Sequence, residues 1–376
     1  MTKYKIHCHP LPQMARCSET YDVSSTYRSG IATLTLDPDG IYNFFLKGDM
    51  SESTAKRNPN HKIAEGHITT EMLKAYNNNE KAFLSLHDKG NISTDLSYSI
   101  DNNVSKQEYY QWKTFSLPKP TLKEVTLLVL EEQALLSKNA KGNGSDLENE
   151  KDAINSSLHE RTEAWEEIQS LFNAIETSME NKTNSIYKRE YESRCKTQND
   201  IINGEDDVIE AAFEEFDSKL DIPFNINLEY KYSKAKGEIE VDIELVDNIE
   251  SLIPLFKAST KASGQISIKS KAQNELAQDV STCQISLIYY IAKAVFNISP
   301  HIKKCCVSLY TNCKIQGLCW ISFNRDKIKS LDFKYLNPLL DFNNWINISN
   351  IKYLKVSTRL EPLDAATFNK LINKIR

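Results

Sequence analysis

The alternation of apolar and polar residues predicts two β-hairpins. Around Lys236-Gly237, apolar side chains occupy every second position of two runs: Ile226, Leu228, Tyr230 and Tyr232, then Ile239, Val241, Ile243 and Leu245. A period of two is typical of strands with one buried face. Within residues 20–49, a Pro38-Asp39-Gly40 turn separates two β-rich runs and predicts the other hairpin.

The most apolar stretch, Glu275–Asn324, predicts one long buried helix followed by two strands. Residues 275–298 carry two seams of apolar side chains spaced three or four positions apart. A helix that is apolar around most of its circumference is buried on more than one side. We expect it to cover the apolar face of the hairpin at 224–245. The strands expected after it are Cys305–Tyr310 and Leu318–Phe323.

Helical spacing of apolar residues predicts further helices at 69–87 and 121–138, and a charged helical segment from Leu147 to Leu220. In that segment one apolar stripe is surrounded by acidic residues. Asn203-Gly204 is expected to separate two antiparallel helices. Other expected features are polar loops at 51–60 and 251–270, a short strand at 112–115 and a linker at 141–146.

These elements predict an α+β protein in which antiparallel β-hairpins pack on a long buried helix. A chain of 376 residues is long enough for two or three domains. We expect a small N-terminal β-hairpin region with helices at 1–140, an acidic helical hairpin inserted at 146–220, and a C-terminal α+β core domain at 221–376.

Charge is distributed unevenly along the chain, although the net charge is only −5. Residues 146–220 contain 20 acidic and 8 basic side chains, whereas residues 300–376 contain 5 acidic and 13 basic ones. This asymmetry is compatible with an anionic partner for the basic region, with the two regions facing each other, or with two solvated surfaces.

The amino-acid usage indicates a cytoplasmic protein without a membrane segment. The first residues contain no apolar run of signal-peptide length, and the longest near-apolar run, Leu287–Ala292, is far shorter than the ~20 residues that span a bilayer. Eight cysteines without a secretory signal suggest reduced thiols. The many Asn, Lys and Ile residues are typical of a bacterium with low GC content.

Two regions of the chain resemble a group of bacterial proteins without a known activity. The run TYRSGIATLTLDPDGIYNFFLKG is similar to a short glycine-containing β-hairpin module at their N-terminus, with matches at Thr26-Tyr27, Gly30, Gly40, Tyr42 and Gly48. The later runs LEYKYS, GEIEVDIEL and NISPHI resemble downstream parts of similar proteins. Where the module usually ends in a Gly-Pro-Gly-rich sequence, this chain has Lys47-Gly48-Asp49. The resemblance implies a fold but no known activity.

Several classes of enzyme lack their motifs in this sequence. There is no GxxxxGK[ST], GxGxxG, GxSxG or HExxH, so phosphate-loop nucleotide binding, serine hydrolysis at a nucleophile elbow and zincin chemistry have no support. No cofactor is expected.

Two groups of residues are candidate metal ligands, because imidazole and thiolate suit zinc. The first is His7, Cys8, His9 and Cys17, whose spacing matches no compact zinc module. The second is Cys305, Cys306, Cys313 and Cys319, of which the first two point to opposite faces of one strand. Buried thiols behave as small apolar groups, so we interpret these cysteines as packing residues and expect no metal site.

An acidic strand face suggests a nuclease as one hypothesis. Glu229-Tyr230-Lys231 fits the ExK pair of restriction-type nucleases, in which carboxylates hold Mg²⁺ and a lysine assists the attacking water. Glu240 and Asp242 on the neighbouring strand would be the other carboxylates. The alternative is ordinary cross-strand ion pairing, with Lys231 opposite the acidic residues.

A basic run near the C-terminus suggests contact with nucleic-acid phosphates. Its residues are Lys303, Lys304, Arg325, Lys327 and Lys329. Asp326 interrupts the run and no aromatic stacking platform accompanies it, so a solvated surface is the alternative interpretation.

The leading hypothesis is therefore an intracellular bacterial interaction or adaptor protein, without an evident catalytic site, that binds a protein partner or itself. One alternative is a divergent metal-dependent nuclease of the defence-effector type. The other is a non-catalytic nucleic-acid-binding protein.

Overall fold

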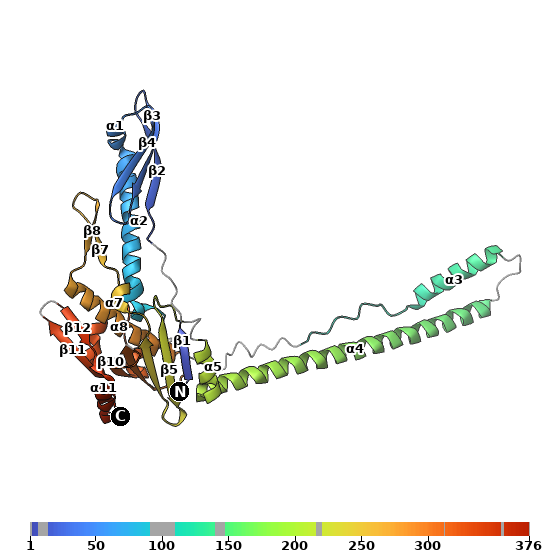
Figure 1. The fold of residues 1–376 in the computed structure, drawn as a ribbon. Helices are drawn as coiled ribbons and strands as arrows, with labels where there is room; N and C mark the ends of the chain where they lie inside the picture. The colour runs from blue at the N-terminus through green and yellow to red at the C-terminus, as the bar shows by residue number, and fades with distance from the viewer. Residues whose placement is uncertain are drawn as a thin grey trace. The chain divides into compact units, whose positions relative to one another are not determined.

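The computed structural model describes residues 2–6, 14–90, 110–139, 147–215, 220–311, 313–354 and 357–375. As predicted, the protein is of the mixed α+β class, with several sheets and one very long helix (Figure 1). It forms two compact units: a core unit made of Met1–Tyr98 and Asn199–Arg376, and a helical unit made of Ser99–Gln198. These bounds differ from the regions 1–140, 146–220 and 221–376, because the core unit is assembled from two separate parts of the chain.

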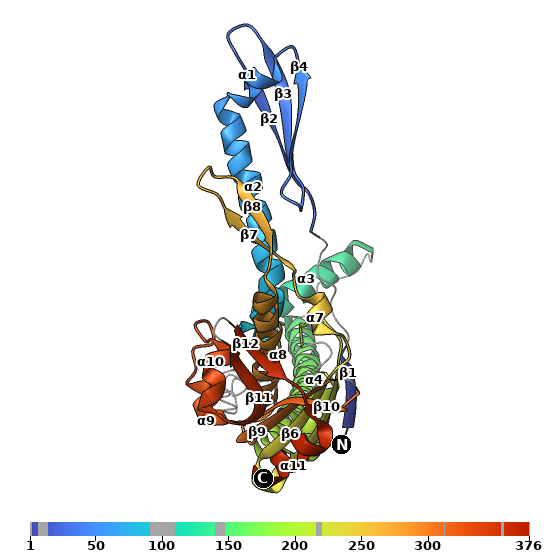
Figure 2. The same ribbon diagram turned by 60° about the vertical axis from the view of Figure 1, so that its left-hand side comes forward.

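The core unit is built on a mixed sheet with the strand order β1-β5-β6-β9-β10-β11-β12 (Figures 1 and 2). Neighbouring strands are antiparallel except for β6 and β9, which are parallel. The predicted hairpin at 224–245 is the β5–β6 pair. The strands are β1 (Thr2–Ile6), β5 (Ile226–Ser233), β6 (Glu238–Leu245), β9 (Lys304–Thr311), β10 (Gln316–Asn324), β11 (Ile346–Leu354) and β12 (Ser357–Glu361), and β13 (Leu363–Asp364) pairs with β10.

The predicted buried helix is α8 (Gln273–Phe296), which belongs to the connection between β6 and β9. Its residues share one apolar cluster with the inward side chains of β5, β6, β9 and β10. The carbonyl groups at and just beyond its C-terminal end are bound by a buried arginine. Arg325 donates from Nη2 to the carbonyl oxygen of Phe296 and from Nε to that of Ile302. A helix end needs such partners because its last carbonyls have none within the helix.

The other face of the sheet is covered near its centre by α11 (Ala365–Ile375). Phe368 and Ile372 of this helix pack against Tyr310 and Trp320 of the sheet. Gly317 makes this contact possible, because a Cβ added there would lie 2.1 Å from the Phe368 ring. Three short elements precede α11: α9 (Arg325–Lys329), α10 (Pro338–Asp341) and η4 (Phe342–Asn344).

A second, three-stranded sheet lies in the N-terminal part of the core unit and confirms the hairpin predicted within residues 20–49. Gly40, with φ of +86°, forms the turn between β3 and β4. The loop predicted at 51–60 is wrong, because Ser51 caps one helix and Asn58 caps the next, with Pro59 at its first position. The elements are β2 (Cys17–Ser24), β3 (Ser29–Leu36), β4 (Tyr42–Gly48), α1 (Glu52–Lys56), α2 (Pro59–Leu84) and η1 (Leu86–Asp88).

The loop predicted at 251–270 is also wrong. This segment contains α7 (Ile249–Leu252) and the hairpin of β7 (Phe256–Thr260) and β8 (Ile266–Ser270). Ile266 packs with Leu34, Ile68 and Met72 of the N-terminal sheet and α2. The backbone N–H of Ile266 donates to the hydroxyl of Tyr42 at 3.2 Å. Contacts with residues far away in sequence therefore stabilise a hairpin whose own polar sequence predicted a loop.

The helical unit consists of α3 (Leu122–Asn139), most of α4 (Leu147–Asn203) and the irregular residues before α3. Two helices lie on either side of Asn203-Gly204, as predicted, but the second has only nine residues, whereas α4 has 57. It ends at Gly204, whose φ is +61°, and α5 (Asp206–Glu214) follows. The short strand predicted at 112–115 is absent from the described residues 110–121, which have no regular structure. The predicted linker at 141–146 lies outside the described residues.

The contact between Gly317 and Phe368 gives a prediction about stability. Gly317→Ala is expected to lower the free energy of unfolding by about 1–3 kcal/mol, because the added methyl group collides with the Phe368 ring. The matched control is Gly66→Ala in the interior of α2, where an added Cβ meets nothing within 4 Å. This change is expected to raise the free energy of unfolding by up to ~1 kcal/mol. Urea denaturation followed by circular dichroism measures both free energies of unfolding. Equal effects of the two substitutions would contradict the close contact between Gly317 and the Phe368 ring.

Candidate functional site

An exposed apolar row runs along α4. Five of its side chains, spaced three, four, four and seven residues apart, are each between 45% and 60% exposed. This spacing puts all five on one side of the helix. Single exposed apolar residues are common in proteins, but a continuous row of them marks an interaction site. We call this row the α4 stripe; it consists of Ile168, Leu171, Ile175, Met179 and Ile186.

A different side of α4 is covered within the helical unit. The ring of Phe115 lies 5.7 Å from that of Trp165 and 5.2 Å from that of Phe172, between ring centroids. The buried carboxylate of Glu176 accepts hydrogen bonds from the backbone N–H of Lys113 at 2.8 Å and from the hydroxyl of Tyr110 at 3.1 Å. These contacts hold the irregular segment 110–121 along α4 and leave the α4 stripe open.

The helix α3 adds more exposed apolar surface to the same unit. It buries Val125 and Val129 and exposes six leucines: Leu122, Leu127, Leu128, Leu130, Leu135 and Leu136. An open groove with a volume of about 610 Å³ is bordered by α3, by α4 residues such as Ile168 and by Leu117–Pro120. The helical unit therefore exposes apolar side chains from both of its helices.

Charge along α4 changes sign close to the middle of the α4 stripe. Residues 147–180 contain nine acidic and two basic side chains, whereas residues 181–198 contain two acidic and five basic ones. The first part of the helix is thus strongly negative and the second part positive. A surface that binds along the whole stripe meets both signs of charge.

The residues of the nuclease hypothesis lie together on one face of the β5–β6 pair. Glu229 is directly opposite Asp242, and Lys231 is directly opposite Glu240. Lys314 and Lys3 bind the Glu229 carboxylate at 2.8 Å and 3.2 Å. Partial burial raises the pKa of Glu229, but the hydrogen bonds from these two lysines outweigh it and hold the pKa below its usual value. The arrangement at Glu229 is that of a cross-strand ion-pair network.

The described residues contain no group of three or more His, Cys, Asp or Glu side chains that could hold a metal ion. Of the first sequence group, His7, Cys8 and His9 lie outside the described residues, and Cys17 is half-buried in β2. In the second group, Cys305 and Cys319 are fully buried, and burial raises the pKa of both thiols well above the usual value. Cys306 is buried on the opposite face of the sheet, and Cys313 is exposed in the turn that follows β9.

The five basic residues considered for nucleic-acid contact have different roles. Arg325 is only 6% exposed and binds carbonyl groups near the end of α8, so its expected surface role is wrong. Lys304 pairs with Glu238 at 3.0 Å, and the Lys327 ammonium lies 4.6 Å from the centre of the Trp345 ring. Lys303 is exposed and Lys329 is half-buried.

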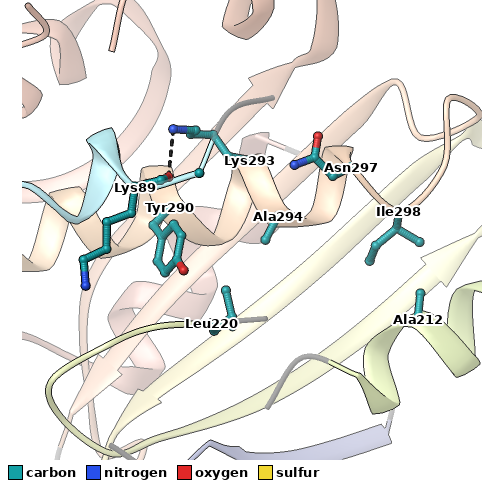
Figure 3. Close-up of a pocket in the computed structure, with 9 residues that line it drawn as sticks. Lys89, Ala212, Leu220, Tyr290, Lys293, Ala294, Asn297 and Ile298 are labelled. Atoms are coloured by element: carbon teal, nitrogen blue, oxygen red, sulfur yellow. Dashed lines mark hydrogen bonds between the residues drawn. The ribbon is translucent and has the colours of Figure 1, made fainter. Parts of the chain in front are cut away.

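A buried lysine on α8 was not identified from the sequence. Lys293 is 2% exposed and lies beside a cavity of about 150 Å³ (Figure 3). Its ammonium donates hydrogen bonds to the carbonyl oxygens of His87 at 2.8 Å and Lys89 at 3.0 Å, and it lies 4.2 Å from the centre of the Phe333 ring. Burial lowers its pKa to about 8. These contacts attach residues 87–89 to α8, so the role that the geometry supports is structural.

A second, polar cavity of about 270 Å³ lies where β6 and β9 end. It is lined by Leu245, by Thr311 and by one side of α8 that includes Ser281 and Gln284. Gln284 is 8% exposed, and its Oε1 has no hydrogen-bond partner among the described residues. Lys293 and Gln284 each interrupt an apolar run of α8, and such an interruption is the signal by which the sequence could have revealed them.

No helix in the described part of the chain is both long enough and apolar enough to cross a membrane.

The lowered pKa of Lys293 predicts a pH-dependent contribution to stability. An unfolded lysine has a pKa of about 10.4, so from pH 8 to 10 the unfolded chain binds a proton that the folded chain has released. The contribution of Lys293 to the free energy of unfolding therefore rises with pH between pH 8 and 10. Below pH 8 the buried ammonium is charged, which lowers the free energy of unfolding by about 3 kcal/mol. The free energy of unfolding of the wild type minus that of Lys293→Met is expected to increase from pH 8 to 10.

Urea denaturation at several pH values measures this difference. Taking the difference cancels the effect of the buried cysteines, whose raised pKa acts in the opposite direction. Lys62→Met, on the exposed side of α2, is the control and is expected to give a constant difference. A constant difference for Lys293→Met would contradict the prediction.

The unpaired oxygen of Gln284 predicts a stabilising substitution. A buried polar atom without a partner costs about 1–3 kcal/mol, so Gln284→Leu is expected to raise the free energy of unfolding by roughly 1 kcal/mol. The control Gln278→Leu lies on the exposed side of the same helix and is expected to change it by less than about 0.5 kcal/mol. Chemical denaturation compares the two, and a clear loss of stability in Gln284→Leu would show that its amide is needed.

Comparisons of the chain with protein families, with curated proteins and with solved structures found no match.

Proposed function

We propose that this protein is a non-catalytic interaction or adaptor protein, in which the helical unit binds a protein partner through the α4 stripe. The observation that carries the proposal is the row of five apolar side chains, each 45–60% exposed, on a helix of 57 residues. A helix of this length with an open apolar side is typical of proteins that associate through helices.

The energetics of the stripe support binding to a complementary surface. Full burial of one such side chain contributes about 1.5–3 kcal/mol, and about half of each stripe side chain remains to be buried. Five residues together therefore offer several kcal/mol. Association costs about 4–15 kcal/mol in lost freedom of motion, so a stable complex also needs charge pairs or the exposed leucines of α3.

The contacts of the other candidate residues favour this function over the alternatives. A hydrolytic metal site needs a carboxylate that is available to the ion, whereas two lysines already bind that of Glu229. In the basic run, Arg325 is buried and Lys304 is paired. We place the protein in a bacterial cytoplasm, because its composition is typical of one and the described cysteines form no disulfide with one another.

Replacing the stripe tests the proposal. The full chain carrying Ile168→Gln, Ile175→Gln and Met179→Gln is purified from cells that also express a differently tagged wild-type copy. We expect at least one stoichiometric partner to co-purify with this triple variant in an amount more than about tenfold below that of the wild type, because the polar side chains remove the apolar contact. This partner is either the second copy or another protein. Quantitative mass spectrometry of the purified material measures the loss.

The matched control carries Ile63→Gln and Leu340→Gln, which replace exposed apolar residues of the core unit. It is expected to retain the partner at the wild-type level. Recovery of the same proteins by the wild type, the triple variant and the control would exclude the stripe as the interaction site.

A further inference from the structure

We infer that the occupant of the α4 stripe is the α4 stripe of a second copy of this chain, lying antiparallel to the first. This inference rests on the proposed function and names its partner. The evidence is the order of apolar and charged residues along the described helix, together with the exposure of each.

The stripe is complementary to its own reversed sequence. When two copies are opposed in antiparallel orientation about the middle of the stripe, Ile168 lies opposite Ile186 and Ile175 lies opposite Met179 of the second copy. Four of the five stripe side chains thereby meet an apolar side chain of similar size, and Leu171 lies opposite Thr183. A two-fold symmetric contact of this type needs only one surface on each chain.

Charged residues next to the stripe determine the orientation. Glu160, Glu167, Arg189 and Lys196 are all exposed on one flank, because residues 7 or 22 positions apart lie within about 40° around an α-helix that turns about 100° per residue. None of the four has an ion-pair partner within the described part of the chain, although other charged residues of α4 do.

In the antiparallel arrangement these flanks meet with opposite charges. Glu167 faces Arg189 of the second copy, and Glu160 faces Lys196 of the second copy. Two residues on the same flank of antiparallel helices face each other when the sum of their residue numbers has one fixed value. The sum is the same for Glu167 with Arg189 as for Glu160 with Lys196. The two-fold axis repeats each pair, so that four ion pairs flank one apolar seam.

A parallel pair lacks this match. In parallel coiled coils a flanking residue faces the residue five positions later on the second helix. Arg189 would then face Arg194, and Glu167 would face Phe172. The parallel arrangement places like charges together and leaves the acidic residues without a cation. Charge therefore selects the antiparallel arrangement, over an overlap from residue 160 to 196 that is about 55 Å long.

A charge exchange on the full chain tests the orientation. Glu167→Lys and Arg189→Glu are each expected to raise the dimer dissociation constant about 3- to 30-fold, because each puts like charges together twice in the symmetric dimer. The double variant carrying both changes is expected to return to within about threefold of the wild type. Sedimentation velocity at increasing protein concentration measures the three constants.

Two controls distinguish the effect of the flank charges on dimerisation from that of substitutions elsewhere on α4. Glu163→Lys changes a charge on the side of α4 away from the stripe, and it is expected to leave the constant unchanged. Ile175→Gln is expected to weaken the dimer more than about tenfold through the stripe itself.

Each contrary result has a definite meaning. Wild-type protein that stays monomeric up to about 100 µM overturns the inference, since that concentration corresponds to only modest affinity. The proposed function stands in that case if the stripe variant still loses another protein. A dimer that Ile175→Gln does not weaken forms elsewhere and also overturns the inference. Failure of the double variant to recover overturns the antiparallel orientation.

Discussion

The fold of the core unit depends on the parallel pairing of β6 with β9. Parallel neighbours cannot be joined by a tight turn, so the chain leaves the sheet at Leu245 and returns at Lys304. The long connection that this geometry requires contains α8, which packs on the sheet, and the β7–β8 hairpin, whose Ile266 packs with the N-terminal sheet. The direction of one strand therefore accounts for both the apolar core and the contact of the N-terminal sheet with the rest of the unit.

The helical unit has a different constraint: it contains too little chain to cover α4 on all sides. An irregular segment and one shorter helix pack on α4, and together they cover the side that carries Trp165 and Glu176. Ile168, the first residue of the α4 stripe, borders the groove beside α3, and the stripe as a whole stays 45–60% exposed. A protein that buried this stripe within itself would need one more helix in this unit. In the proposed dimer, α4 of the second copy supplies that helix without lengthening the chain.

The sequence was most informative where a strand or helix depends on its own pattern. Alternation gave the β5–β6 pair, and the apolar seams of α8 gave its position. It failed at β7–β8, which depends on distant Tyr42 and Met72. It predicted the turn at Asn203-Gly204 but not the very unequal lengths of the two helices that the turn separates. Among the candidate site residues, the common face of the four on β5 and β6 could be predicted, because the register of a hairpin follows from its own sequence. The burial of Arg325 could not be predicted, because it depends on where α8 ends in space.

The interruption of the core unit by the helical unit has a consequence for biosynthesis. β1 pairs with β5 in a register that joins Thr2 to Tyr230, so this edge of the sheet can close only after more than 200 intervening residues have been translated. The contacts of the helical unit are contained within 100 residues and are complete before β5 leaves the ribosome. On a polysome, neighbouring nascent chains therefore display α4 while the sheet that contains β5 is still unformed, so the proposed dimer can assemble during translation.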